Sequence, residues 1–144
     1  MMTIRISTIA ALAIALFVGV GVARADEHEA DVKSAEAASE AWLKLIDDGN
    51  YQQSWSDASG VFQSAISEKG WADRVGSVRD PLGKLISRKL ISAKFLTSLP
   101  GMPDGKYVVI QYAAIYANKK SAVEQVTPIL ESDGKWHVSG YYIN

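Results

Sequence analysis

Apolar residues recur at intervals of three and four from residue 32 to residue 78, the spacing of helices that bury one face. The first such stretch predicts a helix that ends at Gly49, because glycine readily adopts the left-handed conformation that terminates helices. Charged residues, Asp47 among them, lie mostly on its other side. Its expected buried face is Val32, Ala35, Ser39, Trp42, Leu45 and Ile46.

Shorter helical stretches follow the first one. Residues 51–62 keep the helical spacing with an interruption near residue 60, which predicts one or two short helices. Ser67 is a residue type favoured at helix N-caps, so we expect a further helix over residues 68–78. This helix ends before Pro81, because the residue that precedes a proline avoids the helical conformation.

From residue 85 onward, branched and aromatic residues alternate with turn residues, a pattern typical of strands. We expect four strands, over residues 85–99, 107–117, 122–131 and 135–143. Short connections between consecutive strands indicate antiparallel neighbours. Helices first and strands afterwards predict an α+β fold, with the N-terminal helices packed on one face of a four-stranded antiparallel sheet.

Two details of the strand pattern need explanation. Pro128 falls within the third strand, where it cannot donate to a neighbouring strand, so the strand needs a free edge, a bulge or a different order. In the last strand we place His137 on the outer face, solvated and with few neighbours. Strict alternation there predicts that the core-facing side chains are Trp136, Val138, Gly140 and Tyr142.

The N-terminus has the pattern of a secretory signal peptide. Arg5 provides a positive charge, residues 9–22 carry none, and Ala23-Arg24-Ala25 has the small-x-small pattern of a cleavage site. We therefore expect a signal peptide over residues 1–25 and a protein that is periplasmic or secreted from a bacterium. A flexible leader over residues 26–31 and a single domain over residues 32–144 complete the expected organisation.

Composition narrows the classes of partner. Without Arg5 and Arg24, 13 of the 15 basic residues remain against 16 acidic ones, and this mild acidity argues against nucleic-acid and anionic-membrane partners. The sequence has no cysteine, which excludes disulfides, thiol catalysis, thiolate metal sites and the acylated cysteine of a lipoprotein anchor. Phosphate loops, dinucleotide motifs, zinc spacings and calcium loops are also absent from it, so we expect no cofactor.

Short motifs spread over the domain carry a family resemblance. They are RDPLG (79–83), SR (87–88), TSLPG (97–101), PDG (103–105), YVV (107–109), NKKSAVE (118–124), GKW (134–136) and SGYYI (139–143). Over residues 35–143 the chain resembles the bacterial domain of unknown function 4019 family. The order of helices and strands is similar to the curved, cone-like sheet of the nuclear-transport-factor-two-like, or cystatin-like, fold. The resemblance implies this fold and no particular activity, because the wider fold includes isomerases, dehydratases and pure binding or dimerisation modules.

One candidate metal site depends on cleavage after Ala25. The new terminus would begin Asp26-Glu27-His28, and a free amine with histidine in third position can hold Cu(II) or Ni(II) in a square plane of nitrogens. The alternative is a polar leader that contains a histidine by chance, and cleavage after Ala23 would remove the motif.

Glu124 is the candidate catalytic residue. It shares one face of its strand with Val126, Pro128 and Leu130, so it could enter an apolar hollow where desolvation readies a carboxylate for acid–base chemistry. The favoured alternative places it at the rim of the sheet, in an ion pair with an arginine or a lysine.

Arg79 and Arg88 flank the elbow between the last helix and the first strand. Guanidinium groups there could hold an anionic ligand through paired hydrogen bonds. The structural alternative, which we favour, is that they serve the fold, because an arginine at a helix end can bond the last free carbonyls.

These observations favour a binding or protein-interaction module whose partner is an unknown small molecule or protein. The strand over residues 107–117 is apolar on both faces, which indicates a possible homodimer through the outer face of the sheet. The first alternative is an isomerase or dehydratase that uses Glu124. The second is capture of Cu(II) or Ni(II) by the mature N-terminus.

Overall fold

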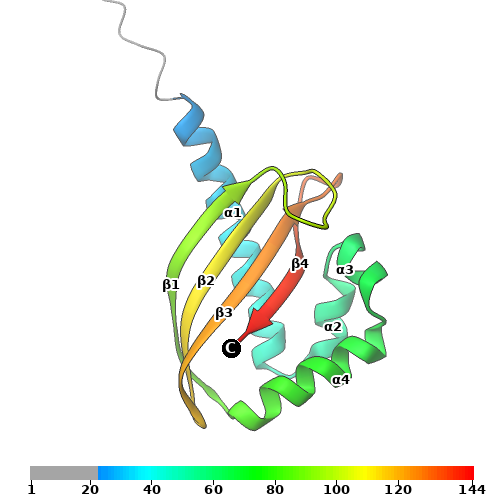
Figure 1. Ribbon diagram of the computed structural model, residues 1–144, viewed down its shortest axis with the longest axis vertical. Helices are drawn as coiled ribbons and strands as arrows, with labels where there is room; N and C mark the ends of the chain where they lie inside the picture. Colours follow the sequence, from blue (N-terminus) through cyan, green and yellow to red (C-terminus); the bar gives the residue numbers. More distant parts are fainter. Residues whose placement is uncertain (1–22) are drawn as a thin grey trace, which may run out of the picture.

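A computed structural model describes residues 23–144 of the chain (Figure 1). The predicted signal peptide lies outside the described residues as far as residue 22, and its last three residues begin the first helix. Within the described range, no helix combines the length and the apolar character needed to span a membrane.

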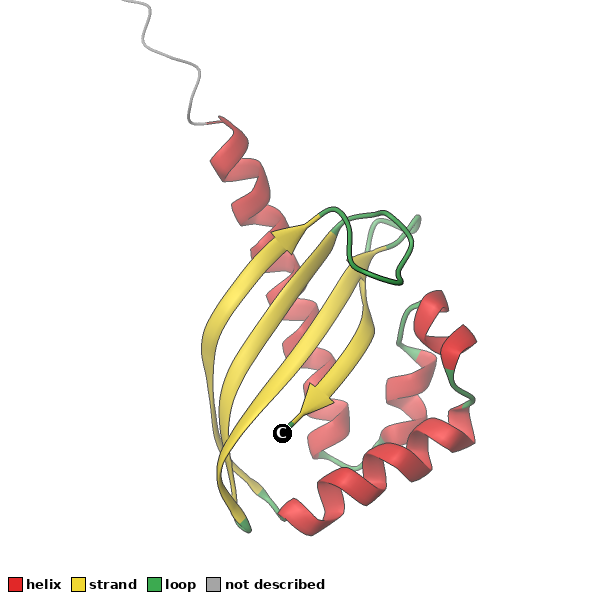
Figure 2. Ribbon diagram, in the orientation of Figure 1, coloured by secondary structure: helices red, strands yellow, loops and turns green. Residues whose placement is uncertain are grey.

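Helices precede strands along the chain, which confirms the predicted α+β class (Figure 2). The helical part comprises α1 (Ala23–Asp47), α2 (Tyr51–Ser56), α3 (Gly60–Ala65), α4 (Glu68–Arg79) and the short 3-10 turn η1 (Asp80–Leu82). The strands are β1 (Leu85–Leu96), β2 (Tyr107–Tyr116), β3 (Lys119–Leu130) and β4 (Trp136–Ile143).

The four strands form one antiparallel sheet in the order β1-β2-β3-β4. The sheet bends around α1, which crosses all four strands on one face, while α2, α3 and α4 lie beyond β4 (Figures 1 and 2). The core fills the space between α1, these helices and the inner face of the sheet. Its buried members include Trp42, Leu43, Trp71, Val108, Ile110, Val126 and Val138.

Helix α1 begins at Ala23, before residue 32, where the hydrophobic pattern predicts its start. The segment 26–31, expected to be a flexible leader, is helical instead. Tertiary contacts support this extension, because Asp31 forms an ion pair with Lys106 at 3.4 Å and the ring of His28 lies 4.3 Å from that of Phe95. Neither partner is near in sequence, so helical periodicity alone could not indicate the true start.

Helix α4 begins at Glu68 as predicted, but it ends at Arg79, one residue beyond the predicted end. The predicted reason for that end is wrong, because Asp80 precedes Pro81 in a helical conformation, at φ −59° and ψ −43°. The Ser67 hydroxyl accepts a hydrogen bond from the backbone N–H of Gly70 at 3.1 Å, which confirms the predicted N-cap. Pro81 then occupies the 3-10 turn that follows the helix. The chain leaves this turn through Gly83, at φ 74° and ψ −164°, a conformation essentially restricted to glycine.

A bulge in β4 accommodates Pro128 and reverses the predicted faces of the strand's end. The register slips between Thr127 and Pro128, and Ser139 is the extra residue on β4. Beyond Ser139, Tyr141 therefore points inward and Tyr142 points outward, where it is 59% exposed. The bulge explanation for Pro128 is confirmed. The prediction that Tyr142 faces the core is wrong, because strict alternation assumed a strand without an inserted residue.

The conformation of Gly83 gives a stability prediction. Gly83→Ala would place a Cβ 3.0 Å from Asn118 Nδ2 and 3.1 Å from Ala117 Cβ, whereas a Cβ at Gly101, also at φ 74°, would meet nothing within 4 Å. We expect Gly101→Ala to lower the free energy of unfolding by about 1 kcal/mol and Gly83→Ala by about 3 kcal/mol. Urea denaturation of the two variants measures the difference, and equal losses would contradict the close approach at Gly83.

Candidate functional site

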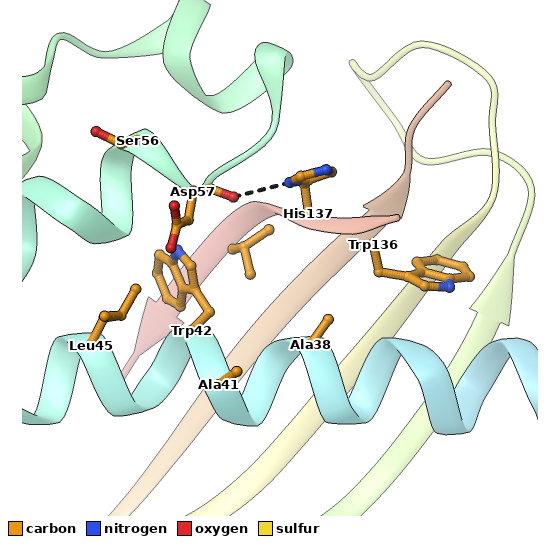
Figure 3. Close-up of a pocket in the computed structure, with 9 residues that line it drawn as sticks. Ala38, Ala41, Trp42, Leu45, Ser56, Asp57, Trp136 and His137 are labelled. Atoms are coloured by element: carbon orange, nitrogen blue, oxygen red, sulfur yellow. Dashed lines mark hydrogen bonds between the residues drawn. The ribbon is translucent and has the colours of Figure 1, made fainter. Parts of the chain in front are cut away.

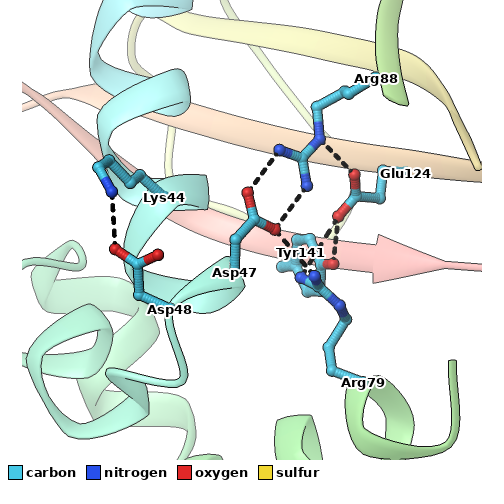
Figure 4. Close-up of polar contacts among 7 residues, drawn as sticks. All are labelled: Lys44, Asp47, Asp48, Arg79, Arg88, Glu124 and Tyr141. Atoms are coloured by element: carbon cyan, nitrogen blue, oxygen red, sulfur yellow. Dashed lines mark hydrogen bonds and ion pairs between the residues drawn. The ribbon is translucent and has the colours of Figure 1, made fainter. Parts of the chain in front are cut away.

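Asp47, the last residue of α1, holds two arginines from different elements (Figure 4). Arg88 of β1 donates two hydrogen bonds to it, from Nη1 to Oδ2 at 2.8 Å and from Nη2 to Oδ1 at 2.9 Å. Arg79, in the last turn of α4, donates from Nη2 to Oδ1 at 2.8 Å. The carboxylate therefore joins the end of α1 to α4 and to the sheet.

Glu124 of β3 completes this buried network. Its side chain is 0% exposed and accepts hydrogen bonds from Arg88 Nε at 2.6 Å and from the Tyr141 hydroxyl at 2.5 Å. Arg79 Nη1 lies 3.8 Å from Glu124 Oε2. We call Asp47, Arg79, Arg88, Glu124 and Tyr141 the buried ion network; it contains two acidic and two basic side chains.

The surroundings of Asp47, Arg88 and Tyr141 shift the pKa of each of these side chains. Burial alone would raise the pKa of Asp47, but the hydrogen bonds from Arg88 and Arg79 outweigh it and lower that pKa. Burial would lower the pKa of Arg88, yet Asp47 and Glu124 raise it overall. Burial and the neighbouring Glu124 raise the pKa of Tyr141, so its hydroxyl stays protonated and remains a donor.

Arg79 is the least satisfied member of the network. Its side chain is 6% exposed, and its Nε and Nη1 atoms have no hydrogen-bond partner among the described atoms. The guanidinium carbon lies 4.9 Å from the centre of the Tyr116 ring, a cation–π distance. The ring face and the nearby Glu124 carboxylate supply the electrostatic compensation that hydrogen bonds do not.

The structure brings together three of the sequence-predicted site residues, Glu124, Arg79 and Arg88. Glu124 pairs with the arginines, as the structural interpretation expects, but it is buried beneath α1 and α4 rather than placed at a rim. Sequence reasoning missed two further members, because it placed Asp47 on the exposed side of its helix and Tyr141 on the outer face of its strand.

The predicted metal site lies apart from this network. Asp26, Glu27 and His28 fall in the first turns of α1, and His28 is exposed. Across the part of the chain whose placement is described, no three His, Asp or Glu side chains gather as a metal would require. The Cu(II) or Ni(II) chelate stays a prediction, because it depends on where the mature N-terminus lies.

A groove of about 500 Å³ runs between β4 and the helices α3 and α4. We call it the β4 groove. Its walls are mainly apolar, and Arg74 is the only charged residue among those that line it. Aromatic side chains stand close together there, with the rings of Phe62 and Trp71 4.8 Å apart. Its other main lining residues include Ala65, Val75, Tyr141 and Ile143.

The β4 groove borders an open strand edge, because β4 is the last strand of the sheet. Asn144 and Val123 exchange two backbone hydrogen bonds of 3.2 Å, so Tyr142 belongs to the next bonded pair along the ladder. The N–H and C=O groups of Tyr141 and Ile143 therefore point away from β3, toward the outer edge.

Among the described residues, a backbone hydrogen bond covers only the beginning of this edge. The N–H of Ser59 donates to the Val138 carbonyl at 2.9 Å, which closes β4 where it starts. From residue 139 to residue 143, the strand lines the groove instead. An apolar groove thus lies alongside backbone groups that are free to pair, and the sequence pattern, which assigned the aromatic residues to the core, gave no sign of it.

A second hollow, of about 410 Å³, lies between α1, the end of α2 and β4 (Figure 3). His137 lines it, with Nδ1 3.1 Å from the Asp57 carbonyl and Nε2 2.8 Å from Asp133 Oδ2. Burial opposes protonation, but these two acceptors outweigh it and raise the pKa of His137. The expectation of a solvated histidine with few neighbours is wrong, because the chain folds the end of α2 and the last hairpin onto it.

Comparison with known proteins identifies a family. The sequence profile of the family described as "Protein of unknown function (DUF4019)" matches residues 38–141. No curated protein shows significant similarity to the chain. The match covers the C-terminal part of α1, all the later helices and the sheet up to Tyr141.

From the buried ion network we predict that a single substitution of similar side-chain volume strongly lowers the free energy of unfolding. Glu124→Gln keeps the side-chain volume but removes one of the two buried negative charges that balance Arg79 and Arg88, so we expect a loss of about 3–5 kcal/mol in the free energy of unfolding. Asp48→Asn, which removes the exposed ion pair with Lys44, should cost less than about 1 kcal/mol. Urea denaturation compares the two, and a loss at Glu124 no larger than at Asp48 would contradict the role of the network.

His137 predicts a pH dependence of stability. The pKa of His137 is raised in the folded protein, so its protonation contributes to the free energy of unfolding. This contribution is fully present below the ordinary histidine pKa of about 6.5, and it is lost as the pH rises through the higher pKa of the folded state. Unfolding free energies measured from about pH 5.5 to pH 8.5 should therefore fall in the natural protein. The fall should disappear in His137→Gln, and an unchanged slope in that variant would assign the effect to other groups.

Proposed function

The chain belongs to the DUF4019 family, a family of unknown function, and from this premise we propose that the domain is a binding module rather than an enzyme. The single observation that carries the proposal is the β4 groove, an open apolar site of about 500 Å³. This volume falls in the range typical of ligand sites, roughly 300–1,000 Å³, and such sites are mostly apolar with a few polar groups.

The residues that could perform acid–base chemistry support binding over catalysis. Glu124 is bonded to Arg88 and Tyr141 and lines neither of the two hollows described above. The β4 groove is lined by no carboxylate and no histidine. An isomerase or dehydratase that used Glu124 would have to break two of its short hydrogen bonds and open the core before a substrate could reach the carboxylate.

We further propose that the domain acts in the periplasm or outside the cell. The signal-peptide pattern of residues 1–25 supports this location. Formal net charge is −1 over the whole sequence, which suits a protein or small-molecule partner better than nucleic acid.

A homodimer through the outer face of the sheet is the second candidate. Ile115 and Tyr142 lie on that face and are 40% and 59% exposed, unusually high for such large apolar groups. Sedimentation at increasing protein concentration tests this interface, and a strict monomer would count against it.

The proposal predicts where ligands bind. Titration of the ¹⁵N-labelled protein with a library of apolar small molecules and short peptides should shift amide signals of α3, α4 and β4 around the groove. Ala65→Trp fills the groove from an exposed position on α3, so it should weaken binding at least about tenfold. Ala37→Trp makes the same change on an exposed position of α1, away from both hollows, and should leave binding unchanged.

Two results would contradict the proposal. One is a set of shifts that cluster at the His137 hollow or on the outer face of the sheet. The other is equal binding by the natural protein and Ala65→Trp.

A further inference from the structure

We infer that the occupant of the β4 groove is an extended peptide segment, which pairs with β4 as a fifth strand and places a carboxylate against Arg74. This inference rests on the proposed function and specifies the chemistry of its ligand. It follows from three features of the groove: the direction of its free backbone groups, the length of its open edge and its charge.

The free backbone groups require a partner that offers the same groups in return. Tyr141 and Ile143 each direct an N–H and a C=O away from β3, and no backbone hydrogen bond outside the ladder reaches them within the described residues. Groups spaced two residues apart along a strand match the repeat of another extended chain. A small apolar molecule could fill the groove but would leave these groups unpaired.

The open edge has the length of a short strand. It extends over residues 139–143, between the point closed by Ser59 and the end of β4. At roughly 3.3 Å per residue, this edge is about 17 Å long, close to the usual length of a strand. A peptide added there would turn every second side chain toward Phe62, Trp71 and Val75, because side chains alternate between the faces of a strand. Peptide recognition that combines strand addition with pockets for alternate side chains is a known binding mode.

Arg74 supplies the charge preference. It is exposed, it is the only charged residue that lines the groove, and the ion pairs of the described residues do not include it. A free guanidinium binds a carboxylate through two parallel hydrogen bonds. The matching group on the peptide is either its C-terminal carboxylate or an acidic side chain. Amidation of the C-terminus removes the first and leaves the second unchanged, which distinguishes them.

A second copy of this chain fits the groove less well. Two copies paired through their β4 edges would each bring Arg74 to the interface and, from the groove itself, no acidic side chain to meet it. The helices α3 and α4 of each copy would also have to pass alongside the same edge (Figure 1). Complementary charge therefore favours a separate acidic peptide.

The experiment uses the protein over residues 26–144 and synthetic peptides of about eight residues. In these peptides valine, leucine or phenylalanine alternates with threonine, and the C-terminus carries the carboxylate. Affinity is measured for the free acid, for the C-terminal amide and for an amide with an internal glutamate. The tightest peptide is then N-methylated at one backbone position at a time. Alternate positions should lose about tenfold or more in affinity, while the positions between them change little, because only every second N–H points toward β4.

Hydrogen exchange and two variants complete the test. Binding should slow the exchange of the Tyr141 and Ile143 amide protons about tenfold or more, since these become ladder donors. Arg74→Gln should remove the preference for an acidic peptide, and Lys69→Gln, the same charge loss elsewhere on α4, should keep it. A preference that survives in Arg74→Gln would overturn the assigned role of this residue.

The remaining outcomes separate this inference from the proposed function. If peptides or small molecules bind in the groove with no alternation in the N-methyl series, strand addition is wrong and the binding module stands. Self-association that protects the Tyr141 and Ile143 amides without peptide would make a second copy the occupant and overturn the inference. Absence of any ligand-induced shift around the groove would overturn the proposed function itself.

Discussion

The buried ion network is the constraint on which the rest of the structure depends. Asp47 and Glu124 share two guanidinium groups, so the end of α1, the end of α4, β1, β3 and β4 all meet at one set of charges. Removing one member of such a set leaves another charge buried without its partner, which is far more costly than never burying the pair. Through Arg79, the network therefore ties the end of α4 to α1 and to the sheet.

Charged side chains are distributed differently between the buried ion network and the β4 groove. Glu124 has the residue type and the burial of a catalytic acid, but its oxygens already accept hydrogen bonds from Arg88 and Tyr141. In contrast, the β4 groove is open and mainly apolar, and the backbone groups that Tyr141 and Ile143 direct away from β3 have no backbone partner among the described residues. The buried ionisable side chains thus hold the helices and the sheet together, whereas the outer edge of β4 faces the groove.

The bulge at Ser139 links these two regions. One inserted residue turns Tyr141 inward, where its hydroxyl reaches Glu124, and turns Tyr142 outward. The same shift decides which backbone groups of β4 point to β3 and which point to the groove. Pro128 on the neighbouring strand sits at the register slip, so a residue that cannot donate to the ladder is placed where the ladder is already interrupted.

The sequence by itself determined the order of elements, the antiparallel meander, the N-cap at Ser67 and the need for an irregularity at Pro128, because each depends on residues close together in the chain. Only the tertiary structure decided the true start of α1, the inward side of Tyr141 and the roles of Asp47 and Arg88. Asp47 and Arg88 are 41 residues apart, and Arg88 and Glu124 are 36 apart, so their contact exists only once the sheet has formed. The two-residue periodicity of a strand predicts which side chains share a face, but a single bulge reverses the faces of all residues beyond it. The β4 groove depends on how β4 packs beside α3 and α4. The sequence pattern within each of these elements does not specify that packing.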